Sequence, residues 1–443
     1  MEVRKISKIT VVDAPCGAGK TSWAIQQFRR NPDKQYIYVT PLLDEIKRIK
    51  HATEGIRKFE DPKYEDGRKI HGFNRLLANG DDIALTHSTF ANSNDETLRL
   101  LKEAAPVLVM DETINILVDY NETQGKSHRL SGKYESNIKL LIDGGDIEVD
   151  EYGRVNWVSA NSYPNSAFSE VERLARSGNL LWLDNHLLLW EFPPQIFQYF
   201  SEIYVLTYLF EGSYLKPFFD YHGLEYEKKS VVKHGSSYEL CPYRADYEWR
   251  KKQKGLLHIE SRLNHYRNSQ LSSTGQDRLM CKGKETDLSK ALKNDLYNYF
   301  QNIRQAKAAD ILWTCKEVYK SQLKGKGYTS FQKEISDNST GESKKVTVDC
   351  FLPLNARASN EYKERHNLAY VYNMNSNPSY DKYFAKRTDV NGLPISIDND
   401  LFAVGCLIQW IWRSAIRDGE EVWIYLPAPR MRNLLIRWLD GEL

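Results

Sequence analysis

The sequence predicts an α/β protein with mainly parallel β-sheets, because strand-like and helix-like segments alternate along its 443 residues. Three segments carry this prediction. Residues 9–30 are a short β-branched run, a glycine-rich loop and an amphipathic run, and residues 107–112 are an apolar run that ends in two acids. Residues 409–427 contain a helix-like segment followed by another apolar run. Alternation of this kind favours parallel strands covered by helices on both faces of the sheet.

The glycine-rich segment contains a phosphate-binding loop. It follows the pattern G-x-x-x-x-G-K-[ST], except that Ala14 takes the first glycine position. Glycine at positions 17 and 19 permits positive φ angles, which turn backbone N–H groups inward, and the following helix adds its positive end. The residues expected to bind the nucleotide are Ala14, Pro15, Cys16, Gly17, Ala18, Gly19, Lys20, Thr21 and Ser22.

Two side chains of this loop have expected chemical roles. Lys20 can reach the β- and γ-phosphates, and the Thr21 hydroxyl can bind Mg²⁺. The alternative is a glycine turn that happens to precede a lysine. A strand before the loop and a helix after it favour the phosphate loop, and ATP is the expected nucleotide.

The strand-like run 107–110 ends in Asp111 and Glu112. In P-loop enzymes, an acid at the end of a neighbouring strand holds Mg²⁺, and a second acid orients or deprotonates the attacking water. We therefore assign Asp111 to the metal and Glu112 to the water. The pair could instead simply begin a loop. A water-activating acid indicates a hydrolase, since a kinase has no need of one.

Composition limits the class of protein. Hydrophobic residues make up 41% and charged residues 27%, which is typical of globular chains, and the length allows about two to four domains. A net charge of +2 neither requires nor excludes a polyanionic partner. The six cysteines form no C-x-x-C pair, which argues against a disulfide framework or structural zinc. No apolar run has the length of a membrane span, so a soluble, cytoplasmic protein is expected.

The alanine-containing loop and the order of the following segments resemble the superfamily 2 (DExx-box) helicases. Residues 36–43 resemble motif Ia, and residues 83–90 resemble the next element, motif Ib, a strand ending in small hydroxyl residues. The resemblance implies backbone contacts to nucleic acid, which hydroxyls and N–H groups can make without reading bases. The residues concerned are Thr40, Pro41, Thr86, His87 and Ser88. Each segment could also be an ordinary strand with a polar end.

Residues 203–207, followed by 211–213, resemble motif III, in which Thr207 would couple the nucleotide to the strand-binding face. In most relatives this motif lies closer to the acidic pair. We therefore expect an insertion at about residues 120–200, containing a hairpin-like segment at 143–155.

In the second half, residues 309–315 resemble motif IV. A strand-like run at 346–354 leads into 355–360, which resembles motif V and implies nucleic-acid contacts by Asn355 and Arg357. The glycine- and lysine-rich stretch at 316–345 is expected to be a loop region, either a solvated loop or a phosphate contact.

Residues 409–417 resemble motif VI, Q-x-x-G-R-x-x-R. Helical spacing predicts that Gln409, Arg413 and Arg417 share one face, and the resemblance implies that the arginines reach the γ-phosphate. Two departures stand out: Trp412 replaces the glycine, and the last arginine comes one residue late. Arg413 is therefore the better candidate for an arginine finger. The alternative is a solvated polar face on an amphipathic helix.

The resemblance as a whole implies two RecA-like P-loop lobes, at 1–225 and 226–443, with the insertion in the first lobe. It implies an ATP- and Mg²⁺-dependent enzyme that moves on or unwinds single-stranded or partly duplex nucleic acid, with DNA expected over RNA. The motifs further resemble bacteriophage helicases, which suggests a role in phage DNA replication or recombination with partner proteins in the host cytoplasm. Two alternatives are a DNA-packaging motor or nucleotide kinase with the same loop, and a nucleotide-binding switch protein.

Overall fold

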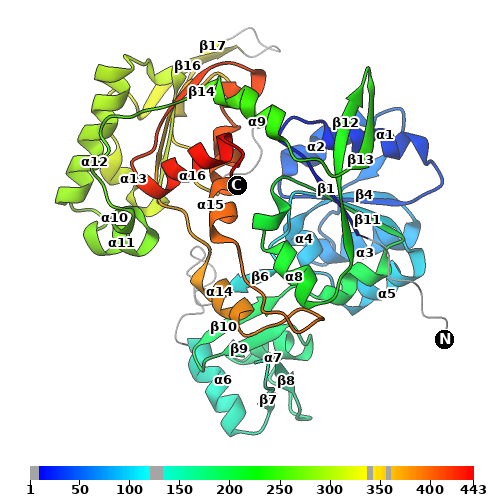
Figure 1. Ribbon diagram of the computed structural model, residues 1–443. Coiled ribbons are helices and arrows are strands. Elements are labelled where there is room, and N and C mark those ends of the chain that lie inside the picture. The colour runs from blue at the N-terminus through cyan, green and yellow to red at the C-terminus, as the bar shows by residue number, and fades with distance from the viewer. Residues whose placement is uncertain (1–8, 120–132, 337–342, 356–360) are drawn as a thin grey trace.

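The computed structural model describes residues 9–119, 133–336, 343–355 and 361–443. The chain forms two α/β lobes, with an insertion attached to the first (Figure 1). Both sheets are dominated by parallel strands, so the predicted fold class is confirmed.

The first lobe is built on an eight-stranded sheet in the order β13-β12-β1-β11-β5-β2-β4-β3. All neighbouring pairs are parallel except β12 and β13, which form an antiparallel hairpin. The strands are β1 (Ile9–Asp13), β2 (Tyr36–Thr40), β3 (Phe59–Glu60), β4 (Asp82–Thr86), β5 (Val107–Asp111), β11 (Glu202–Thr207), β12 (Tyr226–His234) and β13 (Ser237–Pro242). The central strands are almost wholly apolar because helices cover both of their faces.

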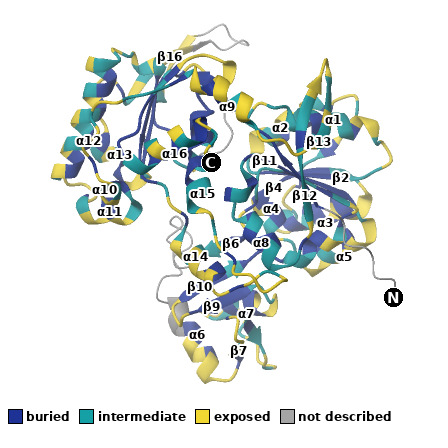
Figure 2. Ribbon diagram, viewed as in Figure 1, coloured by how far each residue is buried: buried dark blue, intermediate teal, exposed yellow. Residues whose placement is uncertain are grey.

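The helices of the first lobe form two layers (Figure 2). On one face, α1 and α2 contribute Trp23, Phe28 and Ile49 to a core with the sheet, while α3, α5 and α8 pack on the other face. The helices are α1 (Lys20–Arg30), α2 (Leu43–Ala52), α3 (Lys69–Asn79), α4 (His87–Ala91), α5 (Asp95–Ala104) and α8 (Leu215–Tyr221).

The second lobe has a four-stranded parallel sheet in the order β14-β19-β18-β15. Its strands are β14 (Leu257–Ile259), β15 (Ile311–Cys315), β18 (Asn367–Val371) and β19 (Val422–Tyr425). Its helices are α9 (Tyr247–Lys254), α10 (Asn268–Leu271), α11 (Ser273–Leu279), α12 (Asp287–Tyr297), α13 (Lys320–Leu323), α15 (Asn399–Ile411) and α16 (Pro429–Leu439). Helix α15 stands between the two lobes (Figure 1).

The expectation of a loop region at 316–345 is wrong for part of that stretch. Strands β16 (Ser330–Ser336) and β17 (Ser343–Asp349) pair antiparallel as a hairpin. The predicted strand at 346–354 therefore divides: its first part belongs to this hairpin. Residues 350–352 then pair with the edge strand β15, through Trp313 N to Cys350 O (2.9 Å) and Leu352 N to Trp313 O (3.0 Å).

The insertion leaves the first lobe after β5 and returns before β11. It contains a small antiparallel sheet, β6-β10-β9, and the hairpin β7–β8 predicted from the sequence. Its elements are β6 (Leu117–Asp119), α6 (Lys133–Asp143), β7 (Ile147–Val149), β8 (Val155–Trp157), α7 (Ser169–Arg176), β9 (Leu180–Leu183) and β10 (Leu187–Glu191).

The lobe boundary differs from the expectation in two respects. Strands β12 and β13 follow residue 225 yet complete the first sheet. Helix α14 (Pro378–Ala385) comes from the second half of the chain, but its Tyr383 and Phe384 belong to the first-lobe core. The Tyr380 hydroxyl also donates to the Leu117 carbonyl at 2.6 Å. The C-terminal half thus returns to the first lobe before α15 begins.

Across the described ranges, every helix is either too short or too polar to cross a bilayer.

Candidate nucleotide site between the lobes

The P-loop, residues 14–19, connects β1 to α1 in the predicted strand–loop–helix arrangement. Gly17 and Gly19 have φ angles of 80° and 94°, which side chains with a Cβ rarely adopt. The ammonium group of Lys20 donates to the carbonyls of Ala14 (2.6 Å) and Pro15 (3.0 Å). The loop therefore has the backbone form that turns N–H groups toward an anion.

Asp13, immediately before the loop, is a buried residue that the sequence reasoning missed. Its carboxylate accepts hydrogen bonds from the backbone N–H groups of Leu209 (2.9 Å) and Phe210 (3.1 Å), and burial raises its pKa. The sequence feature that could have indicated Asp13 is an acidic residue at the C-terminal end of an apolar strand, directly before the glycine-rich loop. Asp13 ties the start of the P-loop to the segment that follows β11.

Thr207 is the last residue of β11 (Glu202–Thr207). Its strand, β11, is between β1 and β5. The carbonyl of Thr207 accepts from the N–H of Ala14 (3.1 Å), and the preceding carbonyl, of Leu206, accepts from Glu112 (2.9 Å). A shift of β11 would therefore move the P-loop and the acidic pair together.

Asp111 and Glu112 lie at the carboxyl end of β5. Burial, and the nearby carboxyl groups of Glu112 and Glu45, raise the pKa of Asp111 to about 7. Burial and Asp111 likewise raise the pKa of Tyr38 on the adjacent strand β2. Glu112 has a φ angle of 62°, a left-handed conformation that is uncommon for a residue with a side chain.

This donor set fits Mg²⁺. The ion prefers oxygen ligands such as carboxylates and hydroxyls, and Asp111 at the end of β5 and Thr21 in the first turn of α1 supply them. A divalent cation would also offset the mutual repulsion of the carboxyl groups that raises the pKa of Asp111.

The predicted single helical face for Gln409, Arg413 and Arg417 is wrong. Helix α15 ends at Ile411, so Gln409 lies in its last turn. Ser414 adopts an extended conformation, with φ −89° and ψ −172°, and its hydroxyl donates to the Ile411 carbonyl at 2.6 Å. Such a side-chain bond competes with the helix ladder, and a 3₁₀ turn at Ala415–Asp418 follows.

Arg413 nevertheless lies close enough to the P-loop for its charge to oppose the rise in the pKa of the Cys16 thiol that burial causes. Arg413 is only 8% exposed, and its buried Nε atom has no hydrogen-bond partner in the described part of the chain. Burial lowers the pKa of its guanidinium, while the nearby acidic groups of Glu112, Cys16 and Asp111 act in the opposite direction. A buried guanidinium nitrogen without a partner is a costly arrangement that an anion would relieve.

Cys16, within the P-loop, also lies where the two lobes are in contact. Its side chain packs against the hydrophobic core of the second lobe. Burial raises the pKa of its thiol, and Lys20, Glu112, Arg413 and Arg417 are the charges that act on it. Groups from both halves of the chain therefore surround one loop.

The residues expected to contact nucleic acid differ in how far they are exposed to solvent. Thr40 is fully buried and its hydroxyl lacks a partner among the described residues, so it does not reach the surface. The Thr86 hydroxyl caps α4 by accepting from Thr89 N (3.3 Å). His87 is buried, and its Nε2 lies 3.1 Å from the Asp111 carbonyl. The strand expected at 83–90 ends at Thr86, since α4 begins at His87.

Other members of that set have some surface. Ser88 and Asn355 are exposed, and Pro41 is partly exposed. Arg357 lies outside the described residues. Exposure leaves Ser88, Pro41 and Asn355 accessible to a partner.

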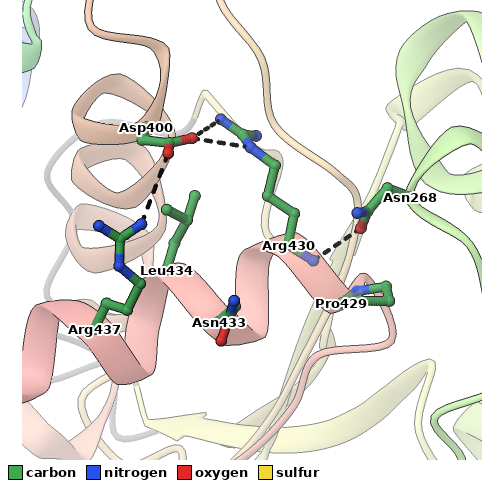
Figure 3. Close-up of a pocket in the computed structure, with 7 residues that line it drawn as sticks. All are labelled: Asn268, Asp400, Pro429, Arg430, Asn433, Leu434 and Arg437. Carbon is green, nitrogen blue, oxygen red and sulfur yellow. Dashed lines mark hydrogen bonds and ion pairs between the residues drawn. The ribbon is translucent and has the colours of Figure 1, made fainter.

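A separate open pocket of about 290 Å³ lies in the second lobe, at the start of α16 (Figure 3). Two arginines line this pocket. Arg430 donates to Asp400 at 2.8 and 3.1 Å, and Arg437 lies 4.0 Å from the same carboxylate. Arg430 pairs with Asp400, and Arg437 also lies 3.7 Å from Glu442, so both arginines of the pocket already have carboxylate partners. The interlobe residues are the better candidate for a nucleotide site.

Comparison with known proteins gives one close relative and a more distant structural likeness. Models of the YonV middle domain and the YonV C-terminal Rossmann-like domain match residues 134–190 and 251–439. The SPbeta prophage-derived protein YonV of Bacillus subtilis (strain 168) is 33% identical over 447 residues, covering 99% of this chain and all of that protein.

Among solved structures, an apo form of XPD matches with a TM-score of 0.51 and 14% identity, over 98% of this chain and 95% of that one. A second XPD helicase structure matches with a TM-score of 0.47 and 12% identity, over 98% and 94%. The first likeness extends over nearly the whole of both chains, so it supports the same two-lobed fold.

Proposed function

The chain belongs to the YonV family, and we propose that it is a nucleic-acid-dependent ATPase of the superfamily 2 (DExx-box) helicase type. It would couple ATP hydrolysis at the lobe interface to translocation on, or unwinding of, DNA. The observation that carries this proposal is the position of Arg413. Arg413 of the second lobe is buried and has a nitrogen that lacks a partner among the described residues. Against the effect of burial, its charge acts to lower the pKa of the Cys16 thiol in the P-loop, and Glu112 acts to raise the pKa of Arg413 itself.

Each of these residues has a separate role in the proposed hydrolysis of ATP. The backbone N–H groups of residues 16–21 and the ammonium of Lys20 bind the phosphates, and Asp111 and Thr21 hold Mg²⁺. Bound Mg²⁺ would neutralise charge on the phosphate oxygens. Glu112 orients the attacking water and accepts its proton. Arg413, with Arg417 as a second candidate, stabilises the charge on the transferring phosphoryl group; an arginine in this role contributes on the order of 10³–10⁵ in rate.

Hydrolysis would be linked to nucleic acid through β11. Thr207 and Asp13 connect the P-loop to neighbouring segments, and the Asp111 carbonyl meets His87 of α4. Ser88 and Pro41 of the first lobe and Asn355 of the second are the accessible candidates for phosphate contacts, with Arg357 a candidate from the sequence. Relationship to a prophage-derived protein supports a phage setting, and we propose a role in DNA replication or recombination.

The test is nucleotide turnover with and without single-stranded DNA. We expect DNA to stimulate hydrolysis of ATP in the presence of Mg²⁺, and we expect Lys20→Ala and Glu112→Gln to abolish the stimulated rate. Turnover that is indifferent to DNA and to RNA would contradict the proposal. Duplexes with 3′ or 5′ overhangs then distinguish unwinding from translocation alone.

A further inference from the structure

The β12–β13 hairpin, residues 226–242, rises beside α1 at the edge of the first sheet (Figure 1). Its tip is fixed to that helix by side chains of α1. Gln26 accepts from the N–H of Tyr238 (2.9 Å) and donates to the carbonyl of Ser236 (2.9 Å), while Arg30 donates to the Ser237 hydroxyl (2.9 Å). The hairpin therefore has a defined position relative to the P-loop helix.

This attachment places the ring of Tyr238 directly on the P-loop. A Cβ added to Gly19 would lie 2.1 Å from Cε1 and 2.5 Å from Cδ1 of Tyr238. Only glycine at position 19 allows the ring to come so close. Tyr238 as a whole residue is half-buried and packs against the core that α1 and α2 form with the sheet, and Lys233 Nζ lies 5.8 Å from its ring centroid. Part of an aromatic ring thus remains available next to the loop expected to bind phosphates.

The order of the strands sets the direction in which a nucleotide would lie. On one side of β1 come β11 and β5, with Glu112 at the end of β5; on the other side come β12 and β13. Glu112 and Arg413 must face the terminal phosphate, because bond cleavage occurs there. The α-phosphate and nucleoside then extend away from β5, toward the hairpin.

We propose that Tyr238 is a platform for the base of the bound nucleotide, an inference that rests on the proposed function of the P-loop. An aromatic ring offers stacking to any base, because every base has a π face. The platform therefore contributes affinity for nucleoside triphosphates in general and discriminates weakly between bases. Inorganic triphosphate, which has no base, gains nothing from it.

Calorimetric binding of two ligands, a non-hydrolysable ATP analogue and inorganic triphosphate, tests the proposal. We expect Tyr238→Ala to weaken binding of the ATP analogue about tenfold, since loss of a stacking ring costs about that factor in affinity. The affinity for inorganic triphosphate should not change. Tyr238→Leu, which keeps an apolar contact with Gly19, should behave in the same way, and Tyr238→Phe should bind like wild type.

Tyr64 provides a matched control. It is 71% exposed, has Lys69 Nζ 5.4 Å from its ring centroid, and follows β3 at the opposite edge of the sheet. Tyr64→Ala should change neither affinity.

If Tyr238→Ala and Tyr238→Leu weaken the binding of both ligands equally, the ring only supports the P-loop. If the binding of the analogue is unchanged, the ring has no contact with the base. Either result overturns the platform while leaving the ATPase proposal intact. Wild-type protein that binds neither ligand would overturn both.

Discussion

The indole rings of Trp412 and Trp249 pack against each other, with centroids 4.7 Å apart and planes tilted by 36°. Trp412 takes the place of the glycine in the motif that this segment resembles, and it directly precedes Arg413. Trp249 lies on α9, the first helix after the β12–β13 hairpin, and also contacts Tyr208 at 5.9 Å. Three rings thus connect the residue after Thr207 to the residue before Arg413.

We predict that Trp249→Leu slows hydrolysis without weakening nucleotide binding. The substitution removes the ring that holds Trp412, so Arg413 loses its fixed position while the P-loop is untouched. A displacement of about 1 Å can cost on the order of 100-fold in rate. Steady-state kinetics and nucleotide titration separate the two effects. Tyr247→Leu, an exposed position on the same helix, is the control and should retain the wild-type kcat.

We predict that Arg413→Ala binds nucleotide with near wild-type affinity but loses at least about 10³ in kcat, because an arginine finger acts mainly on the transition state. Steady-state turnover at saturating ATP provides kcat, and nucleotide titration provides the affinity. Arg437→Ala, a half-exposed arginine of the same lobe, should have no such effect. An unchanged kcat in Arg413→Ala would remove this residue from the site.

Asp13 supports the first lobe through two backbone N–H groups. Asp13→Ala leaves both donors without an acceptor, and a buried donor such as the Phe210 N–H then costs about 1–3 kcal/mol in the free energy of unfolding. Asp13→Asn keeps one acceptor oxygen and removes a buried charge, so we expect a smaller loss. Urea unfolding of the two variants, followed by circular dichroism, measures the difference. Equal losses would show that the carboxylate charge itself is required.

The stability of the second lobe should depend on the protonation of His366. Its Nδ1 lies 2.7 Å from Asp310 and its Nε2 lies 2.6 Å from Glu420. Burial lowers its pKa, but the hydrogen bonds to Glu420 and Asp310 outweigh that effect and raise the pKa above 6.5. The imidazolium is therefore favoured in the folded state. Its contribution is fully present below pH 6.5 and is lost as the pH rises through the higher folded value.

We expect the difference in free energy of unfolding between wild type and His366→Gln to be largest at mildly acidic pH and to shrink in alkaline buffer. Urea titrations across that range measure it. A difference that grows with pH would show that the neutral ring is the stabilising form.

Much of the first lobe was predictable because its signals are local. The glycines at 17 and 19, the apolar runs of β1 and β5, and the turn between β7 and β8 each encode a conformation within a few residues. The family resemblance added the order of the segments and the expectation that a second lobe faces the P-loop.

The parts that were missed depend on long-range contacts. Nothing within β12 shows that it pairs with β1, and nothing within α14 shows that it packs on the first lobe. The end of α15 depends on Ser414, whose hydroxyl bonds to the Ile411 carbonyl, a choice that helical spacing does not reveal. Burial of Thr40 and the two hydrogen bonds of Asp13 likewise arise only when distant strands assemble.

The most direct test of the central claim is an experimental structure with ADP, aluminium fluoride, Mg²⁺ and single-stranded DNA. We predict that the Arg413 guanidinium lies within hydrogen-bonding distance of the fluoride and that Glu112 contacts the water in line with it. An ordered complex in which Arg413 points away from the nucleotide, with Glu112 distant from that water, would contradict it.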